Sequence, residues 1–256
     1  MKKILVIGES CTDLFEYGTC TRLNPEAPTP VFVSSETNRN AGMAANVYSN
    51  IISLAGHTEF EIEFMQSSPD QIIKHRFVDK ASNYILLRVD KDGPVDKIDL
   101  MNPETVKKIE DADLVVVSDY DKGFLSESDL VTIASFAKKS FIDTKKPIKS
   151  WTSLFSYIKI NKREFENPAN DTQTLSIHSD KIIVTLGESG AKIGSTYIKP
   201  KTKVAVKDVS GAGDTFLAAL VVEYARSGNI VKSIEYANEC AAIAVSNKGV
   251  VSVGYL

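Results

Sequence analysis

The residues best suited to chemistry form one short stretch in the last third of the chain. It reads Asp-Val-Ser-Gly-Ala-Gly-Asp-Thr-Phe over residues 208–216 and runs into a segment with helical spacing of apolar residues. Small residues let a backbone approach a phosphate closely, and the free N–H groups of a helix's first turn point at it. Asp214 stands where a carboxylate can accept the proton of an attacking hydroxyl. The stretch predicts phosphoryl transfer; the structural alternative is a glycine-rich turn with an aspartate favoured at a helix start.

The composition disfavours several other classes of function. Cys11, Cys20 and Cys240 lack the spacing of a metal site or a disulfide framework, and their odd number favours reduced thiols and a cytoplasmic location. The three histidines are not paired at ligand spacing, so no zinc site is expected. The net charge of −3 gives no electrostatic attraction for nucleic acid or an anionic membrane. No stretch approaches the length of a membrane span, so we expect no membrane partner.

The elements that must position the 208–216 stretch alternate between buried strands and helices. Apolar runs of strand length occur at Ile4–Ile7, Leu114–Val117, Phe141–Ile142, Tyr157–Ile160 and Ile182–Thr185. Helical spacing occurs at Ala44–Leu54, Pro103–Glu110, Ser128–Lys138, Asp214–Ser227 and Ile230–Ser246. This alternation predicts an α/β fold with a doubly wound, mostly parallel sheet covered on both faces. The length of 256 residues favours a single domain over residues 1–256.

Two regions interrupt the alternation, at about residues 13–36 and 74–90. Each contains a pair of runs with strand character, which predicts a small accessory β-sheet beside the main one. We call this accessory sheet the lid. The segment 24–30, with Pro25, Pro28 and Pro30, is too rich in proline for a helix and is expected to be a structured connector.

The 208–216 stretch resembles the C-terminal signature of the ribokinase-like (phosphofructokinase B type) carbohydrate kinases. The resemblance implies a ribokinase-like fold, ATP and Mg²⁺ as cofactors, and Asp214 as the base. It also implies an anion hole made by Gly211, Ala212 and Gly213. A dependence on a monovalent cation is left open.

The segment 41–46 is similar to the family's N-terminal GGxxxN element, with Ala41 replacing the first glycine. Gly42 lets the backbone approach a sugar closely, and Asn46 offers both a donor and an acceptor to its hydroxyls. Asp13, after the first strand, matches the family's acceptor of a sugar hydroxyl. A helix start rich in small residues, and a turn aspartate, are the structural alternatives.

Three further matches imply a nucleotide site. Asn161 and Glu164 fall in a segment similar to the family's NxxE motif, where the glutamate acts on Mg²⁺ through water. The segment 185–190 resembles the family's nucleotide loop, which implies roles for Thr185, Gly187 and Gly190; its spacing does not match a Walker A motif. Asn238 falls where the family borders the adenine.

Within the family, the bacterial heptose-7-phosphate kinases match more segments than other branches. Residues 21–31 resemble their R-[IL]-x-P-E-A-P-x-P-V segment, 118–123 their SDYxKG loop and 86–90 their LLRVD strand, while 143–145 match their DPK more loosely. The resemblance implies phosphorylation of the anomeric hydroxyl of D-glycero-β-D-manno-heptose 7-phosphate. It also implies a substrate site with Arg88, Asp119 and Lys122. The two cations suit the phosphate of such a substrate, with surface ion pairs as their structural alternative.

Two departures from this branch leave alternatives open. Between Gly56 and Lys74 the chain is shorter than those kinases, so we expect part of the sheet edge to be missing, and their nucleotidyltransferase half is absent from this sequence. A kinase of the same fold acting on another sugar or a nucleoside is one alternative. An inactive relative that binds a sugar phosphate is the other. The family's lids often mediate dimer contacts, which makes a homodimer through the lid a further expectation.

Overall fold

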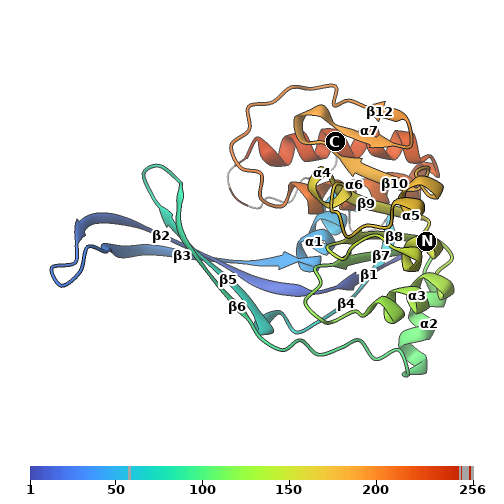
Figure 1. The fold of residues 1–256 in the computed structure, drawn as a ribbon, viewed down its shortest axis with the longest axis horizontal. Helices are drawn as coiled ribbons and strands as arrows, with labels where there is room; N and C mark the ends of the chain where they lie inside the picture. Colours follow the sequence, from blue (N-terminus) through green and yellow to red (C-terminus); the bar gives the residue numbers. More distant parts are fainter. Residues whose placement is uncertain (57–58, 248, 250–253, 255–256) are drawn as a thin grey trace.

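The main sheet is built from the apolar, mostly β-branched runs seen in the sequence, which suit a pleated surface buried on both sides (Figure 1). The computed structural model describes residues 1–56, 59–247, 249 and 254. These residues form an eight-stranded sheet in the order β12-β11-β10-β9-β8-β7-β1-β4. Its strands are β1 (Lys2–Gly8), β4 (Phe60–Gln66), β7 (Leu114–Asp119), β8 (Ser140–Thr144), β9 (Tyr157–Asn161), β10 (Ile182–Thr185), β11 (Ala191–Ile193) and β12 (Thr196–Ile198).

All neighbouring strands from β4 to β10 are parallel, and β11 and β12 complete one edge in antiparallel fashion. Because parallel strands point the same way, the residues that follow β1, β7, β8, β9 and β10 gather at one edge of the sheet. The crevice at this edge is where open α/β sheets bind ligands.

Helices cover both faces of the sheet. Ile4 and Val6 of β1 pack toward α1, α6 and α7, whereas Leu5 and Ile7 pack toward α2, α3 and the segment before β9. This alternation of period two, with both faces buried, explains the continuous apolar strands. The helices are α1 (Ala44–Ala55), α2 (Pro103–Asp111), α3 (Glu127–Phe136), α4 (Lys162–Phe165), α5 (Thr172–Ile177), α6 (Ala212–Ser227) and α7 (Ile230–Val245).

A second sheet of four strands, in the order β3-β2-β5-β6, projects from the main body as a long arm (Figure 1). Its strands are β2 (Ser10–Leu23), β3 (Pro30–Met43), β5 (Ile72–Asp79) and β6 (Ile85–Asp92). This is the lid, and its strands extend beyond the predicted limits because residues 36–43 of β3, most of them polar, pair along β2 down to Ser10. The proline-rich segment forms the turn between β2 and β3. The doubly wound α/β core with a small β lid is confirmed.

The short passage between Gly56 and Lys74 supplies the edge strand of the main sheet. β4 pairs in parallel with the whole of β1, from Lys2 with Phe60 to Gly8 with Gln66. Residues 57 and 58 lie outside the described residues, and within the described part of the chain no strand pairs with the outer edge of β4. Across the described helices, none is long and apolar enough to cross a membrane.

Candidate active site

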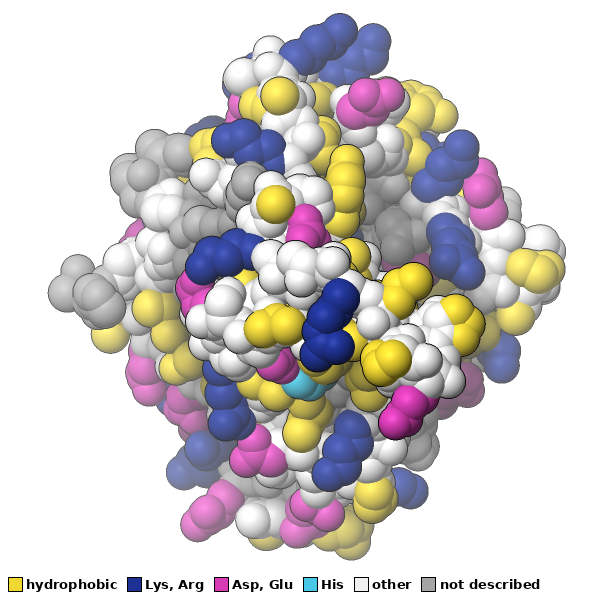
Figure 2. Space-filling view, turned by 90° about the vertical axis from the view of Figure 1, so that its left-hand side faces the viewer, with side chains coloured by type: hydrophobic (Ala, Val, Ile, Leu, Met, Phe, Trp, Pro, Cys, Tyr) yellow, Lys and Arg dark blue, Asp and Glu magenta, His cyan; other side chains and the backbone are white. Residues whose placement is uncertain are grey.

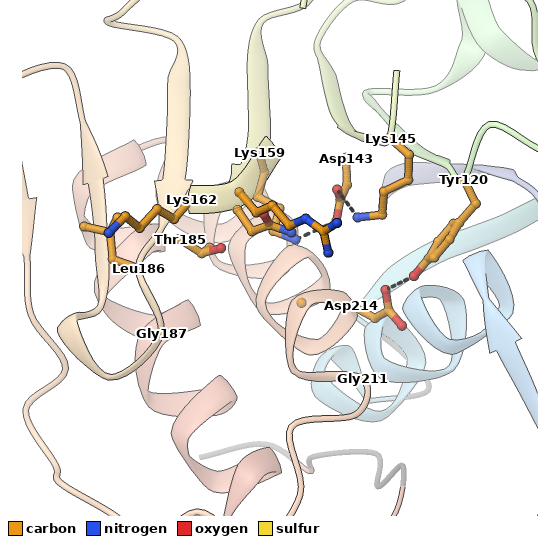
Figure 3. A pocket seen from close by; sticks show the side chains of 13 residues that line it. Tyr120, Asp143, Lys145, Lys159, Lys162, Thr185, Leu186, Gly187, Gly211 and Asp214 are labelled. Carbon is orange, nitrogen blue, oxygen red and sulfur yellow. Dashed lines mark hydrogen bonds and ion pairs between the residues drawn. The ribbon is translucent and has the colours of Figure 1, made fainter. Parts of the chain in front are cut away.

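Asp214 lies in the first turn of α6, at the carboxyl edge of the main sheet (Figure 3). Gly211 precedes the helix with a φ of 77°, a left-handed conformation that glycine adopts without strain. No side chain caps this helix start, and the N–H of Ala212 donates to the carbonyl of Val209 at 3.3 Å. The remaining N–H groups of the first turn are therefore available to an anion.

The carboxylate of Asp214 is 7% exposed and accepts two hydrogen bonds. The Asn46 side-chain amide donates to Oδ2 at 2.8 Å, and the Tyr120 hydroxyl donates to Oδ1 at 2.7 Å. Burial raises the pKa of Asp214, whereas these two hydrogen bonds lower it in part. A raised proton affinity suits a carboxylate that must take a proton from an alcohol.

On the lid side, Gly42 lies beside Asp13, and Asn46 follows Gly42 four residues further along the chain. A Cβ on Gly42 would lie 2.5 Å from Oδ2 of Asp13, so only glycine fits beside that carboxylate. Asp13 is 6% exposed and pairs with Arg76 of β5 at 2.5 Å. Asn46 comes from the first turn of α1, directly after β3, and links this group to Asp214. The lid and the core thus meet at Asp214.

On the other side of Asp214 lies a cavity of about 410 Å³ (Figure 3). Glycines and basic side chains dominate its lining, which comprises Tyr120, Asp143, Lys145, Lys159, Asn161, Lys162, Arg163, Thr185, Leu186, Gly187, Gly211, Gly213 and Asp214. A Cβ added at Gly213 would lie 3.0 Å from Nζ of Lys159, so a larger residue at this position would have to shift the lysine. A concave, cationic cavity beside a helix start suits a polyphosphate.

Ion pairs fix the cations deepest in this cavity. Lys159 is 3% exposed and donates to Oδ2 of Asp143 at 2.6 Å. Lys145 pairs with Glu164 and lies 3.8 Å from Oδ1 of Asp143. Oδ1 of Asp143 is buried and accepts no hydrogen bond from the described residues. Among those residues Arg163, at the start of α4, makes no ion pair, which leaves its guanidinium available to an anion.

Asn161 and Glu164 hold each other across the start of α4. The Glu164 N–H donates to the Asn161 side chain at 2.9 Å, and the Asn161 N–H donates to the Glu164 carboxylate at 2.8 Å. Asn161, Thr185 and Gly187, which are predicted at the nucleotide site, line the cavity. The reciprocal bonds form a capping box, so the NxxE segment also builds the helix that it begins.

Gly190, the last residue of the predicted nucleotide loop, and Asn238 are not among the residues that line the cavity. Gly190 has a φ of 84°, and a Cβ there would lie 2.3 Å from the carbonyl oxygen of Ile198. The side-chain amide of Asn238 donates to the same carbonyl at 2.9 Å. Both residues therefore support β12 in this structure.

Arg88, Asp119 and Lys122, which the resemblance places in the substrate site, each hold a partner from another part of the structure. Asp119 is 1% exposed and accepts hydrogen bonds from Thr144 and Lys146. Lys122 pairs with Asp92 at the end of β6, at 2.6 Å. Arg88 lies opposite Arg76 in the lid register and so shares its face, but it is exposed and pairs with Asp90.

Sequence reasoning assigned no role to several residues that the structure places around Asp214, or against Asp13 and Tyr120. They are Lys74 and Arg76 of the lid, Tyr120, Asp143, Lys145 and Lys159. A lysine within the buried β9 run was a usable signal for Lys159, because a lysine is almost never fully buried unless it is paired. The contact of Tyr120 with Asp214 joins positions 94 residues apart, and no local pattern indicates it.

The fold is of the ribokinase type. Similar solved structures are ribokinase from Arabidopsis thaliana complexed with ribose and ATP (TM-score 0.70, 15% identity, 99% of this chain and 96% of that chain) and ribokinase from Thermotoga maritima (TM-score 0.74, 17% identity, 98% and 95%). Phosphofructokinase-2 from Escherichia coli is also similar (TM-score 0.72, 13% identity, 100% and 96%). At these identities the likeness establishes the fold.

The pfkB family carbohydrate kinase model matches residues 74–253, which is more than half of the chain. The chain therefore belongs to the pfkB family of carbohydrate kinases and is an ATP-dependent carbohydrate kinase.

Among curated proteins, the chain is 31% identical over 301 residues to Bifunctional protein HldE from Helicobacter pylori strain J99, covering 97% of this chain and 64% of that protein. It is 31% identical over 296 residues to Bifunctional protein HldE from Campylobacter jejuni strain RM1221, covering 99% and 63%. The chain thus spans less than two thirds of the length of these relatives.

Proposed function

We propose that this kinase transfers the γ-phosphoryl group of ATP to the anomeric hydroxyl of D-glycero-β-D-manno-heptose 7-phosphate. The observation that carries the proposal is Asp214, which lies between the cationic cavity on one side and the Asp13–Asn46 group on the other. Support for this substrate comes from the segments that resemble heptose-7-phosphate kinases and from the similarity to Bifunctional protein HldE.

In the proposed reaction the nucleotide phosphates occupy the cavity between α6 and the ends of β8–β10. Asp214 accepts the proton of the sugar hydroxyl as the new O–P bond forms, and the bond from the γ-phosphorus to the bridging oxygen of ADP breaks. N–H groups at the start of α6, from Gly211, Ala212 and Gly213, stabilise the charge on the transferred group in this proposal, and the Ala212 N–H leaves the Val209 carbonyl to do so. Thr185, Gly187, Gly190 and Asn238 form the rest of the nucleotide site in this proposal.

Kinases of this fold generally use Mg²⁺, and the carboxylates near the phosphate cavity fit a hydrated cation. Oδ1 of Asp143 is buried there without a hydrogen-bond donor, which is the kind of oxygen that a metal-bound water satisfies. Glu164 is linked to Asp143 through Lys145, which pairs with both carboxylates. Asp143 and Glu164 would hold the hydrated ion with Asn161 beside them. When bound, Mg²⁺ neutralises phosphate oxygens.

On the acceptor side, Asp13, Gly42 and Asn46 orient the sugar ring in this proposal. Arg88, Asp119 and Lys122 remain proposed ligands of the sugar phosphate, although each holds a partner that the substrate would have to replace.

The structure adds Lys74 to the proposed acceptor side. Its Nζ lies 5.3 Å from the centre of the Tyr120 ring, and it makes no ion pair among the described residues. A partly buried ammonium group without a carboxylate partner suits an anionic substrate.

ADP release across a panel of sugars, nucleosides and sugar 7-phosphates tests this function, with Asp214→Asn as the blank. A signal confined to heptose 7-phosphate is the expected result. A signal with another sugar or with a nucleoside would contradict the proposed substrate while keeping the kinase reaction. Silence from folded protein that still binds ATP would favour an inactive sugar-phosphate-binding relative.

We also propose that the lid mediates a homodimer. Figure 2 views the molecule from the lid end, where hydrophobic side chains lie among lysines and arginines. Val33, Ile85, Leu87 and Val89 of the lid are each about half exposed. Because monomers rarely expose so many large apolar side chains on one sheet, a second copy of this lid is the proposed cover.

A further inference from the structure

The side chain of Tyr120 contacts residues of α6, of the lid and of the segment after β8, next to Asp214. Its hydroxyl donates to Oδ1 of Asp214 at 2.7 Å. Two ammonium groups lie near its ring: Lys74 of the lid at 5.3 Å from the ring centre and Lys145 of the core at 5.4 Å. Burial, before any other cause, raises the pKa of Tyr120 well above its ordinary value, so its hydroxyl keeps its proton and acts as a donor.

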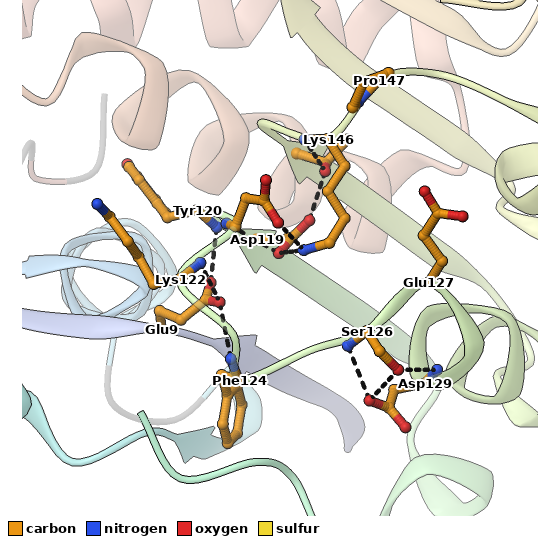
Figure 4. A network of polar contacts seen from close by, with 12 residues as sticks. Glu9, Asp119, Tyr120, Lys122, Phe124, Ser126, Glu127, Asp129, Lys146 and Pro147 are labelled. Atoms are coloured by element: carbon orange, nitrogen blue, oxygen red, sulfur yellow. Dashed lines mark hydrogen bonds and ion pairs between the residues drawn. The ribbon is translucent and has the colours of Figure 1, made fainter. Parts of the chain in front are cut away.

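The backbone of Tyr120 is fixed by a buried carboxylate of another strand end (Figure 4). Glu9, fully buried after β1, accepts the Tyr120 N–H on Oε2 at 2.7 Å. Its Oε1 accepts the N–H groups of Lys122 at 3.1 Å and Phe124 at 3.3 Å. One side chain therefore satisfies three backbone donors of the loop that follows β7.

The residue before Tyr120 is held from the opposite side. Asp119 accepts from the Thr144 hydroxyl at 2.6 Å and from Nζ of Lys146 at 2.7 Å (Figure 4). Lys146 also pairs with Asp121 at 2.9 Å. The loop thus has bonds to the end of β1 on one side and to the end of β8 on the other, which restrains the direction of the Tyr120 ring.

We propose that Tyr120 is a positioning residue for the base Asp214, and that Glu9 holds Tyr120 in the position from which it acts. Tyr120 and Asn46 each anchor one oxygen of the carboxylate, which fixes its plane. Each oxygen keeps a second lone pair, so the sugar hydroxyl can still donate to Asp214. This inference rests on the proposed role of Asp214 as base.

The hydrogen bond also sets the pH range in which the base works. Because the Tyr120 hydroxyl stabilises the charged carboxylate, its removal raises the pKa of Asp214, and the acid limb of the kcat/KM profile moves to higher pH. Other titratable groups that act on Asp214 and its neighbours are Cys11 of β2, Lys74 of β5, Asp143 of β8, Lys145 after β8 and Lys159 of β9. None of them changes when the hydroxyl of Tyr120 alone is removed.

The test is the pH profile of kcat/KM for Tyr120→Phe, with Asp214→Asn measured beside it. We expect kcat near neutral pH to fall roughly 10- to 100-fold. The ratio of kcat/KM at pH 6 to that at pH 9 should fall about tenfold, with ATP affinity unchanged. A profile that superimposes on that of the wild type would overturn the inference. Full activity of Asp214→Asn would instead overturn the proposed function.

Glu9→Gln provides a second, independent variant. The NH₂ of a glutamine side chain cannot accept a backbone N–H, so at least one of the three bonds to the loop is lost. The acid limb of the kcat/KM profile should move to higher pH, as for Tyr120→Phe. In the double variant this limb should move no further than in Tyr120→Phe alone.

Ser126→Ala is the matched structural control for Glu9→Gln. It removes the capping box of α3 at the far end of the same loop. It should lower Tm while leaving the pH profile in place. Additive profile shifts in the double variant, or a shift in Ser126→Ala, would show that general loosening is the cause and would contradict the inference.

Discussion

The core site and the outer strand β6 of the lid hold their charges in opposite ways, whereas the inner lid strands β2 and β5 carry a buried pair between Asp13 and Arg76. In the core, Lys159, Asp143 and Asp119 are each no more than 5% exposed and carry ionic partners. In the lid, every residue of β6 is exposed, and the ion pair of Arg88 with Asp90 is in solvent. Buried pairs at the ends of parallel strands leave a side chain little freedom, whereas exposed pairs hold weakly. We propose that the core carries out the chemistry and that the lid selects the acceptor.

Packing follows the same division. Two large clusters of buried apolar side chains cover the faces of the main sheet, while the cluster at the base of the lid contains only Cys11, Met43 and Ile72 as buried members. Regions with few buried contacts open most easily. We therefore expect contacts with other molecules to stabilise the lid. In the proposed reaction this molecule is the sugar, and in the proposed dimer it is a second lid.

The largest expected effect on stability lies in the core. Lys159→Met leaves Asp143 buried without its closest cation, beside Asp214, so the free energy of unfolding should fall by about 3–5 kcal/mol. Chemical denaturation measures it. Lys162→Met removes an exposed lysine three residues along the chain and should change stability by less than about 0.5 kcal/mol. Equal effects of the two changes would contradict the contrast between buried and exposed charges.

A smaller effect is expected on substrate binding at the lid. Lys74→Met should raise the KM for the sugar phosphate roughly 10- to 100-fold, because Lys74 is partly buried beside Tyr120. Arg88→Met should raise it less than about fivefold, because Arg88 is exposed and already paired. Steady-state kinetics at saturating ATP distinguish the two. The reverse order would assign the phosphate to the outer part of the lid.

The smallest expected effect concerns assembly. Leu87→Lys introduces a charge in the middle of β6, opposite Phe77, and should shift the proposed dimer toward monomer by about tenfold in dissociation constant. Sedimentation equilibrium measures the shift. Val206→Lys, the same kind of change at an exposed apolar residue of the core, is the control. A wild-type chain that stays monomeric at high concentration would refute the dimer.

The sequence predicted the core well because its signals are local. The apolar runs became β1, β7, β8, β9 and β10, and the Gly211–Asp214 turn formed the start of α6. Asp13, Gly42 and Asn46 were proposed from the family resemblance, and the structure places Gly42 beside Asp13 and Asn46 against Asp214. The predicted residue ranges of the lid strands were too short, because the polar residues of β3 form a strand only by pairing with β2.

The polar partners of the base could not be predicted in the same way. Tyr120 reaches Asp214 and Glu9 reaches Tyr120 across long separations in the chain, which depend on the order of strands in the sheet. Arg88 and Lys122 are cations of the right type, but their carboxylate partners come from β6, whose side chains show no periodic burial. Local patterns indicate which residues can do chemistry, and the topology decides which of them meet.

The most direct test of the central claim compares wild type and Asp214→Asn in phosphoryl transfer to heptose 7-phosphate, with ATP binding measured in parallel by calorimetry. The account predicts that Asp214→Asn binds ATP with an affinity close to that of the wild type but transfers phosphate at least about 10³-fold more slowly. Turnover near the wild-type rate would contradict the assignment of Asp214 as the base.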